Sequence, residues 1–318
     1  MRSASILRAI ERDRTSGARE LAEKAAEAVL AFLEEHKGLP QKALLEQLRR
    51  LSLRLLCAQP AMAPLINLVN ALWLKIEQGE GRLAEALAEE ARSFLAGMAG
   101  AAERIARETV NLIRGAEAVP SALLRACLTY SYSSTVLTAF ALAKKEGRAF
   151  QVLCSEGRPA GEGLKLAKAL AALGIPVTLT LDAALPGLVE AADLVLVGAD
   201  AVLFPGFVNK VGTYPLGLAA KAAGVPFYAL CDSRKFLPRS LELLFRIPEK
   251  SPDEVWEASP PRVQVINRYF EVIPLSLLSG LVSEEGVLTP REVARRLRGQ
   301  KVSKKLLHLA QARRETGD

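Results

Sequence analysis

The sequence predicts an α/β protein in which an N-terminal helical bundle domain is followed by a Rossmann-like domain with a parallel sheet. Up to residue 118, Ala, Leu, Glu and Arg recur at helical spacing, whereas the rest of the chain alternates short apolar runs with amphipathic stretches. Val119 and Pro120 separate the two patterns, so we expect domains at 1–118 and 119–318. Half of the 318 residues are hydrophobic, which is enough for two cores.

The N-terminal part is expected to contain four to six helices. In 21–33, for example, small and apolar residues return every three or four positions. A long helix is expected over 83–114, ending near Gly115. The breaks between helices are predicted at 37–40, 59–60, 64 and 78–81, where Gly, Pro and Gln interrupt the pattern.

The C-terminal part is expected to alternate strands with helices. The predicted strands are 123–130, 150–154, 177–181, 194–197 and 227–230, and the predicted helices are 134–146, 163–173, 186–191 and 216–223. Such alternation requires parallel strands with right-handed crossovers and helices on both faces. Because the carboxyl ends of parallel strands meet at one edge, the polar residues after the strands should lie close together there.

These polar residues form the candidate site. They are Thr129, Tyr130, Ser131 and Ser133, then Glu156, Arg158 and Pro159, then Asp182, Asp200, Asp232 and Ser233, followed by Asn209, Lys210 and Thr213 in an expected loop before the helix at 216. Hydroxyls, carboxylates and an arginine near helix N-termini suit a phosphorylated, polyhydroxylated small molecule. The alternative is that these residues are simply solvated ends of strands.

Several classes of site are disfavoured. The first strand is not followed by Gly-x-Gly-x-x-Gly, and no Gly-x-x-x-x-Gly-Lys-Ser/Thr occurs, although the glycine-rich run 157–163 can cradle a single phosphate. The four cysteines form no Cys-x-x-Cys pair, and the two histidines lie outside the strand-rich part. We therefore expect buried thiols, no metal site and no cofactor.

The net charge of +7 is concentrated in 291–314. Few aromatic residues interleave with these basic ones, so a solvated helical face is favoured over nucleic-acid binding. Charged residues interrupt each apolar run, and residues 1–8 resemble no signal peptide. We therefore expect a cytoplasmic protein without a membrane span.

Eight segments in a fixed order carry a resemblance to a known family. They are 13–22, 59–67, 128–133, 155–159, 197–202, 209–214, 225–228 and 267–274. Through them the chain resembles the alpha, beta and delta subunits of eukaryotic translation initiation factor 2B, with their archaeal and bacterial relatives. That superfamily also contains methylthioribose-1-phosphate isomerase and ribose-1,5-bisphosphate isomerase.

The resemblance implies a Rossmann-like C-terminal domain that dimerises. In the isomerases, the site uses a cysteine after the first strand of this domain, an aspartate in Gly-Ala-Asp, an Asn-Lys pair and phosphate-holding arginines. Asp200, Asn209, Lys210 and Arg158 match this pattern, but Ser131 stands in place of the cysteine. Ser16 also replaces one arginine of the isomerases. A serine hydroxyl needs an adjacent base before it can exchange a proton at a useful rate.

We therefore expect a non-catalytic homodimer, related to the regulatory subunits, that binds a phosphorylated small molecule. The expected ligand-binding residues are Arg158, Asn209, Lys210, Glu156, Thr129, Ser133 and Thr213. The alternative is an aldose–ketose sugar-phosphate isomerase in which Asp200 and Ser131 are catalytic. A third hypothesis is an assembly factor that binds protein or RNA through the basic segment 295–318.

Overall fold

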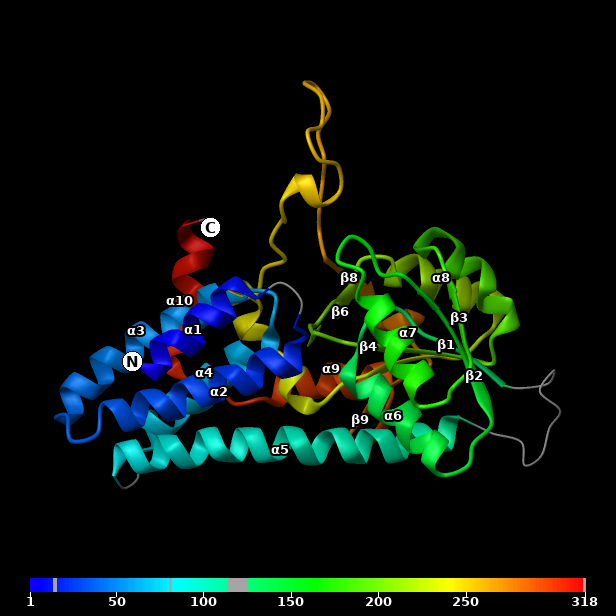
Figure 1. Cartoon of the computed structure of the whole chain (residues 1–318). Helices are drawn as coiled ribbons and strands as arrows, with labels where there is room; N and C mark the ends of the chain where they lie inside the picture. The colour runs from blue at the N-terminus through cyan, green and yellow to red at the C-terminus, as the bar shows by residue number, and fades with distance from the viewer. Residues whose placement is uncertain (14–15, 80–81, 114–124, 317–318) are drawn as a thin grey trace.

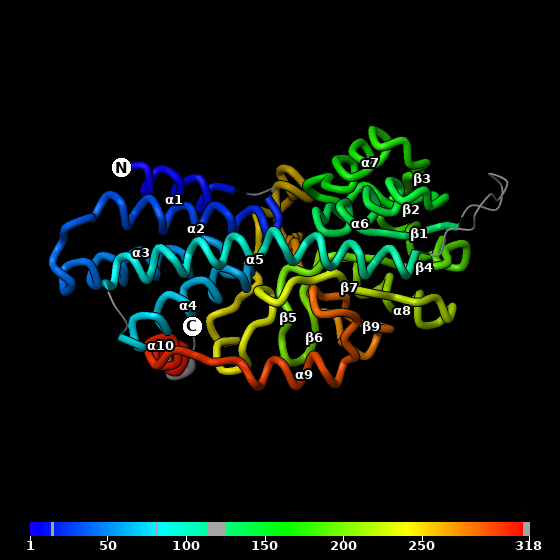
Figure 2. Tube along the Cα trace, turned by 90° about the horizontal axis from the view of Figure 1, so that it is seen from below, coloured from blue at the N-terminus to red at the C-terminus, as the bar shows by residue number. Residues whose placement is uncertain are grey.

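The structure is a computed structural model that describes residues 1–13, 16–79, 82–113 and 125–316. A layer of helices lies beside an α/β body, and helix α5 runs along both of them (Figures 1 and 2). The sequence predicted this class of fold, and the prediction is confirmed.

In the described part of the chain, five α-helices precede the first strand, within the predicted range. They are α1 (Arg2–Arg12), α2 (Ala18–Glu35), α3 (Gln41–Ala58), α4 (Ala63–Gln78) and α5 (Leu83–Leu112). Leu21, Ala25, Val29 and Phe32 line the buried face of α2 at helical spacing. Helix α4 stops at Gly79, which adopts a left-handed conformation with φ 69°.

The main sheet has seven strands in the order β10-β9-β7-β4-β1-β2-β3. All neighbouring pairs are parallel except β9 and β10. The strands are β1 (Arg125–Leu128), β2 (Phe150–Ser155), β3 (Val177–Thr180), β4 (Leu194–Gly198), β7 (Phe227–Leu230), β9 (Gly280–Ser283) and β10 (Gly286–Leu288). The five predicted strands are present, except that residues 123–124 of the first lie outside the described residues.

The connections between these strands contain the predicted helices. They are α6 (Ser134–Lys145), α7 (Glu162–Ala172), the 3-10 helix η2 (Asp182–Ala191) and α8 (Thr213–Ala223). Shorter 3-10 helices are η3 (Ser233–Lys235), η4 (Arg239–Leu244), η5 (Pro252–Glu254) and η6 (Leu275–Leu277). Helices α9 (Pro290–Gly299) and α10 (Lys304–Thr316) follow the sheet.

A second sheet corrects one prediction. Strands β5 (Ala201–Val202), β6 (Gly206–Lys210) and β8 (Phe270–Pro274) form an antiparallel sheet in the order β5-β6-β8. The expected loop after Asp200 is therefore largely a hairpin, and Asn209 and Lys210 lie on a strand. Its partner β8 lies far along the chain, so no local pattern reveals the pairing.

The two parts of the chain share their hydrophobic cores. Ala201, Val208 and Leu306 are buried in one core with residues of α2, α3 and α4, while Ile105 and Val110 of α5 pack beside α6 and β2. Asn70 of α4 accepts a hydrogen bond from the Ser303 N–H (2.9 Å) and donates one to the Lys301 carbonyl (3.0 Å). The predicted boundary at 118 lies outside the described residues.

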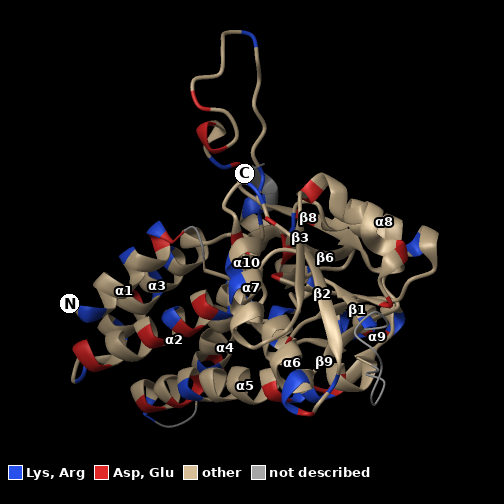
Figure 3. Cartoon of the chain, turned by 45° about the vertical axis from the view of Figure 1, so that its right-hand side comes forward, with Lys and Arg blue, Asp and Glu red and all other residues tan. Residues whose placement is uncertain are grey.

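The basic C-terminal segment contacts other parts of the protein, whereas the sequence predicted only a solvated helical face. Arg296 forms an ion pair with Glu285, and the guanidinium of Arg298 lies 5.2 Å from the centre of the Phe204 ring. Blue and red segments alternate along helices α2 and α5 in Figure 3, so basic residues there are interspersed with acidic ones. In the described part of the chain, no helix has an apolar stretch long enough to cross a membrane.

An arm projects from the body between η4 and β8 (Figure 1). Its base is fixed by hydrogen bonds from the Asn267 amide to the Ser251 carbonyl (2.7 Å) and to the Glu254 carboxylate (2.9 Å). Val255, Trp256 and Ile266 are exposed on it. The arm stands beside the carboxyl ends of the main strands and so helps to shape the candidate site.

Candidate functional site

The strand order reverses between β1 and β4, and most of the predicted site residues lie beyond this point. From β1 the chain moves outward to β2 and β3, then returns to place β4 on the other side of β1. Ligands of such sheets bind in the crevice that this reversal creates. Thr129 and Ser131 follow β1, and Asp200 follows β4, so all three lie at the crevice.

Ser131 occupies a constrained position at this crevice. It is 8% exposed and has φ 61°, a left-handed conformation that is unfavourable for residues with a Cβ. Ser133 caps α6 by accepting a hydrogen bond from the Val136 N–H. A Cβ atom on Gly198 would lie 2.6 Å from the Ser133 hydroxyl, so the end of β4 approaches this cap closely.

Asp200 connects the two layers of the molecule. Its carboxylate accepts a hydrogen bond from the backbone N–H of Ala18, at the first turn of α2. Asp200 as a whole is partly exposed, but its carboxylate group is surrounded by protein atoms. Burial raises the pKa of Asp200, while Lys235 and Lys210 act in the opposite direction. The Lys235 ammonium, itself buried, also donates to the Ala199 carbonyl at 2.7 Å.

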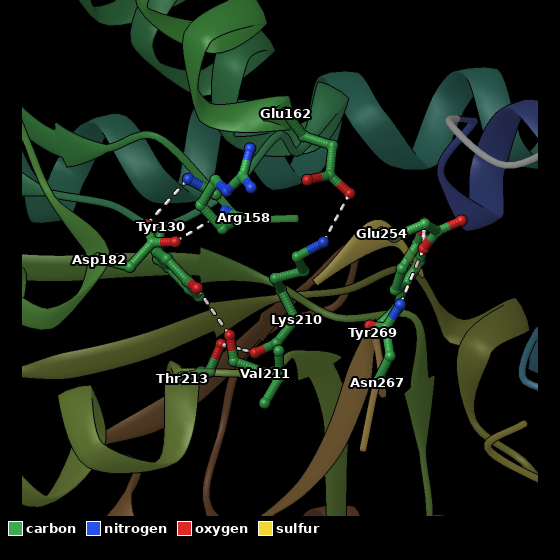
Figure 4. Close-up of polar contacts among 11 residues, drawn as sticks. Tyr130, Arg158, Glu162, Asp182, Lys210, Val211, Thr213, Glu254, Asn267 and Tyr269 are labelled. Carbon is green, nitrogen blue, oxygen red and sulfur yellow. Dashed lines mark hydrogen bonds and ion pairs between the residues drawn. The ribbon is translucent and has the colours of Figure 1, made fainter. Parts of the chain in front are cut away.

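Lys210 lies in the interior of the site. Its side chain is 3% exposed, and its Nζ atom is 2.9 Å from Oε1 of Glu162 in the first turn of α7 (Figure 4). The ammonium also lies 4.5 Å from the centre of the Tyr269 ring, and the Tyr269 hydroxyl donates to Glu254 at 2.6 Å. Lys210 is thus held by a carboxylate and by an aromatic face.

Asn209 and Thr213 hold the turn between β6 and α8. The Asn209 amide donates to the Thr213 hydroxyl (3.0 Å), which donates to the Lys210 carbonyl (2.6 Å). The Tyr130 hydroxyl donates to the Val211 carbonyl at 2.6 Å. These contacts fix the backbone on either side of Lys210, and they involve side chains that we predicted as ligand-binding.

Asp182 orders the turn after β2. Its carboxylate accepts hydrogen bonds from the Ser155 hydroxyl (2.6 Å), the Gly157 N–H (2.8 Å) and the Arg158 N–H (2.7 Å). Figure 4 shows the Arg158 side chain extending toward the same part of the crevice as Glu162. Glu156 remains partly exposed in this turn.

A cavity of about 450 Å³ lies between this turn and the projecting arm. It is lined by Arg158, Pro159 and Val211 from the body and by Glu254, Val255, Ile266, Asn267 and Arg268 from the arm. Its volume is within the range of small-molecule pockets, which is about 300–1,000 Å³. A ligand at the crevice would therefore have room to extend beneath the arm.

The helix N-termini at this edge are not equivalent. Helix α2 meets Asp200, α7 has Glu162 in its first turn, and the Gly212 and Tyr214 N–H groups at the start of α8 donate to Glu271 (2.8 and 2.7 Å). Helix α6, which begins beside Ser131, has no acidic residue in its first turn. Among the described helices at this edge, α6 is therefore best placed to receive the anionic group of a ligand.

None of the four cysteines offers a reactive thiol at the crevice. Burial raises the pKa of Cys127 to about 12 and that of Cys154 to about 11, and it raises the pKa of Cys231 well above its ordinary value. Cys57 lies on α3, outside the crevice. Within the described ranges, no three His, Cys, Asp or Glu side chains are grouped to hold a metal ion.

Three important contributors were missed by the sequence analysis. Glu162 lies in the glycine-rich run that we noted, at the start of a predicted helix, so a signal for it existed. Lys235 follows the strand β7 by a few residues, but its inward direction depends on packing. The Ala18 N–H reaches Asp200 only because the helical layer packs on the sheet.

The fold and the site define a class of protein: a Rossmann-like α/β domain joined to helices that contribute to a polar crevice at the switch point. The chain matches the Initiation factor 2 subunit family over residues 14–290 and belongs to that family. The family was predicted from the sequence, and the prediction is confirmed.

Individual relatives have names of two kinds. A relative from Pyrococcus abyssi, with a name of the type eIF-2B subunit 2-like, is 33% identical over 292 residues, which cover 91% of this chain and 97% of that protein. The ribose 1,5-bisphosphate isomerase of Methanocaldococcus jannaschii is 29% identical over 279 residues, covering 86% and 87% of the two chains.

The solved structures that this chain resembles likewise include both an initiation factor and an isomerase. The crystal structure of translation initiation factor eIF-2B from Pyrococcus horikoshii OT3 has a TM-score of 0.78 and 30% identity, covering 92% of this chain and 98% of that one. The 5-methylthioribose 1-phosphate isomerase from the same organism has a TM-score of 0.71 and shares the fold at 24% identity, with coverage of 96% and 88%.

Proposed function

We propose that this protein is a non-catalytic member of the family, similar to the regulatory subunits, that binds a phosphorylated sugar or nucleotide at the crevice. The observation that carries the proposal is Ser131, which stands in place of the isomerase cysteine beside a retained set of charged residues. Asp200, Lys210 and Arg158 belong to that set. The site thus keeps charged side chains that can bind a phosphorylated ligand, and it lacks the cysteine that the isomerases use in their reaction.

The arrangement of charges supports a phosphorylated ligand. The N-terminus of α6 and the Arg158 guanidinium suit a phosphate group, because both offer N–H donors. The carboxylates of Asp200 and Glu162 suit hydroxyl groups, because an ionised carboxylate only accepts hydrogen bonds. We propose further that Glu156, Thr129 and Ser133 line the same site, and that Asn209 and Thr213 support it through the turn that they hold.

The absence of a second activated group argues against catalysis. Aldose–ketose isomerisation moves a proton between neighbouring carbon atoms and requires groups that accept and donate it. The raised pKa of Asp200 suits one such role, but a serine hydroxyl needs a base next to it. His36 caps the C-terminal end of α2 and His308 lies on α10, so neither histidine belongs to the strand ends that form the crevice.

In this proposal the protein acts through ligand-dependent binding of partners. The names of the relatives motivate a role in translation initiation. We propose further, from the resemblance of the sequence alone, that the protein is cytoplasmic and forms a homodimer through its C-terminal domain. Chromatography with light scattering, before and after adding ligand, tests the dimer. A monomer under both conditions would contradict this part of the proposal.

The first experiment separates binding from turnover. Methylthioribose 1-phosphate, ribose 1,5-bisphosphate and AMP are titrated calorimetrically into the wild type and into Ser131→Cys, and ketose formation is followed in the same samples. We expect binding without turnover by the wild type. The absence of binding by all three compounds would remove the ligand-binding proposal.

The alternative function is a sugar-phosphate isomerase. The raised pKa of Asp200 favours it, because a carboxyl group with such a pKa suits general acid catalysis. Turnover by the wild type that is abolished in Asp200→Asn would establish this alternative, with Ser131 or a neighbouring residue as part of its chemistry.

A further inference from the structure

A small apolar cavity lies in the helical layer and shares no lining residue with the crevice. It has a volume of about 210 Å³ and lies between α3, α4 and α10. Figure 2 shows α10 beside α4, although the two helices come from opposite ends of the chain. The apolar walls of the cavity are formed by Leu53, Leu56, Val69, Trp73, Leu306 and Leu309.

The walls of this cavity suit an apolar group. Leu56, Val69 and Leu306 are almost fully buried, and the Trp73 indole N–H already donates to the Ser52 hydroxyl at 3.1 Å. Water gains few hydrogen bonds among such side chains, whereas a hydrocarbon group is favoured there. An apolar cavity of about 150 Å³ can hold one benzene molecule. This cavity therefore has room for an apolar group slightly larger than one aromatic ring.

The rim of the cavity is basic. Arg49 from α3 and Lys305 and His308 from α10 line it, and all three are exposed. The Lys305 ammonium lies 5.9 Å from the centre of the Trp73 ring, which places it above the apolar wall. Among the described residues that line the cavity, none is acidic. Glu46 lies 3.9 Å from Arg49 but is not part of the lining.

We propose that this cavity binds a small amphipathic carboxylate, such as a medium-chain fatty acid. The hydrocarbon part occupies the space between α3, α4 and α10, and the carboxylate group meets Arg49 and Lys305 at the rim. This inference is independent of the proposed function, because it concerns another part of the molecule. A ligand bound there links the last helix to the N-terminal layer and stabilises the folded protein.

Other occupants fit the cavity less well. Inorganic phosphate has no apolar part for the walls, and a cationic amphiphile would be repelled by the basic rim. The N-terminus of α10 is not itself an anion site, because Glu77 accepts hydrogen bonds from the Lys304 and Lys305 N–H groups, both at 3.1 Å. A carboxylate with a hydrocarbon chain satisfies both the walls and the rim.

The experiment uses the tryptophan in the wall as its probe. The chain has two tryptophans, so Trp256→Phe on the exposed arm leaves Trp73 as the single one. Emission of Trp73 is followed while octanoate, octanol, octylamine or acetate is added to this variant of the full chain. Thermal melts of the wild type with and without octanoate provide a readout that needs no substitution.

We expect octanoate to change the Trp73 emission saturably and to raise the melting temperature. Octanol should bind roughly tenfold more weakly, and octylamine and acetate should not bind. Affinity should rise by about fourfold for each added methylene group from butanoate to octanoate, because each one is buried against the walls. Neither an emission change nor a thermal shift with octanoate would overturn the inference.

Paired charge variants locate the carboxylate. Arg49→Gln/Lys305→Gln should weaken octanoate binding roughly fivefold to tenfold and leave octanol binding within about twofold. The matched control is Arg50→Gln/Lys304→Gln, which removes the same charge from exposed neighbours that do not line the cavity. An equal loss of octanoate affinity in the two double variants would overturn the inference, because the effect would then be one of net charge alone.

Competition with a crevice ligand separates the two sites. AMP, added to the octanoate complex, should leave the emission of Trp73 unchanged. Displacement of octanoate by AMP would overturn the inference, because octanoate would then occupy the crevice. The absence of AMP binding bears only on the proposed function, since the octanoate site shares no lining residue with the crevice.

Discussion

The two sheets hold the candidate site in different ways. The parallel sheet contributes residues from the turns after its strands, and Asp182 fixes one of these turns through three hydrogen bonds to Ser155, Gly157 and Arg158. The small antiparallel sheet contributes Lys210 from within strand β6, with its neighbours paired to β8. The turns after the parallel strands can adjust their backbone, whereas the antiparallel sheet holds the buried Lys210 ammonium on a rigid strand.

This difference indicates where the site can change most easily. A residue in a turn can be substituted with local rearrangement, but a buried ammonium within a strand depends on its carboxylate partner. Lys210 and Glu162 therefore form a unit, and so do Asp182 and its turn. The predictions below test these two units and then the two residues at the switch point.

We expect the largest effect from Lys210→Met. The substitution leaves Glu162 in the interior without a cation and should lower the free energy of unfolding by about 3 kcal/mol. The double variant Lys210→Met/Glu162→Gln should recover about half of this loss, because it removes the uncompensated charge. Urea unfolding measures both. Lys221→Met, at an exposed position on α8, is the control and should change stability by less than about 0.5 kcal/mol.

Asp182→Ala should have the next largest effect. It removes the acceptor of three hydrogen bonds, and we expect a loss of about 2 kcal/mol in urea unfolding. Asp182→Asn keeps an oxygen acceptor, so its loss of stability should be smaller. If both variants unfold like the wild type, Asp182 does not hold the turn, and the contrast between the two sheets is wrong.

Asp200→Asn should stabilise the protein in a pH-dependent way. Burial raises the pKa of Asp200 above its ordinary value, so the folded protein holds this proton more tightly than the unfolded chain. The stability that this contributes is complete below the unfolded pKa of about 4 and is lost as the pH rises through the folded pKa.

Asparagine cannot ionise. The free energy of unfolding of the variant should therefore increasingly exceed that of the wild type as the pH rises, by about 1 kcal/mol at neutral pH. Thermal melts at several values between pH 4 and pH 8 measure the difference. A difference that shrinks with rising pH would show that Asp200 is stabilised as the anion, by Lys235 and the Ala18 N–H.

The smallest effect is expected from Ser131→Gly. Ser131 has φ 61°, and glycine adopts this conformation without steric cost, although it also gains freedom in the unfolded chain. We expect a net stabilisation of about 0.5 kcal/mol in urea unfolding. Ser134→Gly, within helix α6, should be destabilising instead. Destabilisation by Ser131→Gly would mean that the hydroxyl is bound in the folded protein.

The sequence predicted the parallel sheet because its signals are local. Short apolar runs end in polar residues and are separated by amphipathic helices, and residues 125–230 follow this pattern except in the hairpin of β5 and β6. Strand β6 was missed because it is defined by pairing with β8, about sixty residues later, and because Pro205 and Gly206 at its start indicate a loop.

Only part of the candidate site was predicted, because some of its contacts join residues that are far apart in the sequence. Asp200 was found from its place after a strand, whereas its partner Ala18 belongs to another layer. Lys210 was found, but Glu162 was not, since an acidic residue in the first turn of a helix is ordinarily solvated. Distant pairs of this kind become visible only when the fold has brought them together.

Because α10 packs on the helical layer, the core of that layer can be completed only after α10 has been synthesised. Leu306 and Ala310 complete a core that also contains residues of α3 and α4, and Asn70 is bonded to Lys301 and Ser303. The ribosome releases α3 and α4 more than two hundred residues before these partners. Until α10 has been synthesised, the growing chain therefore presents this apolar surface uncovered.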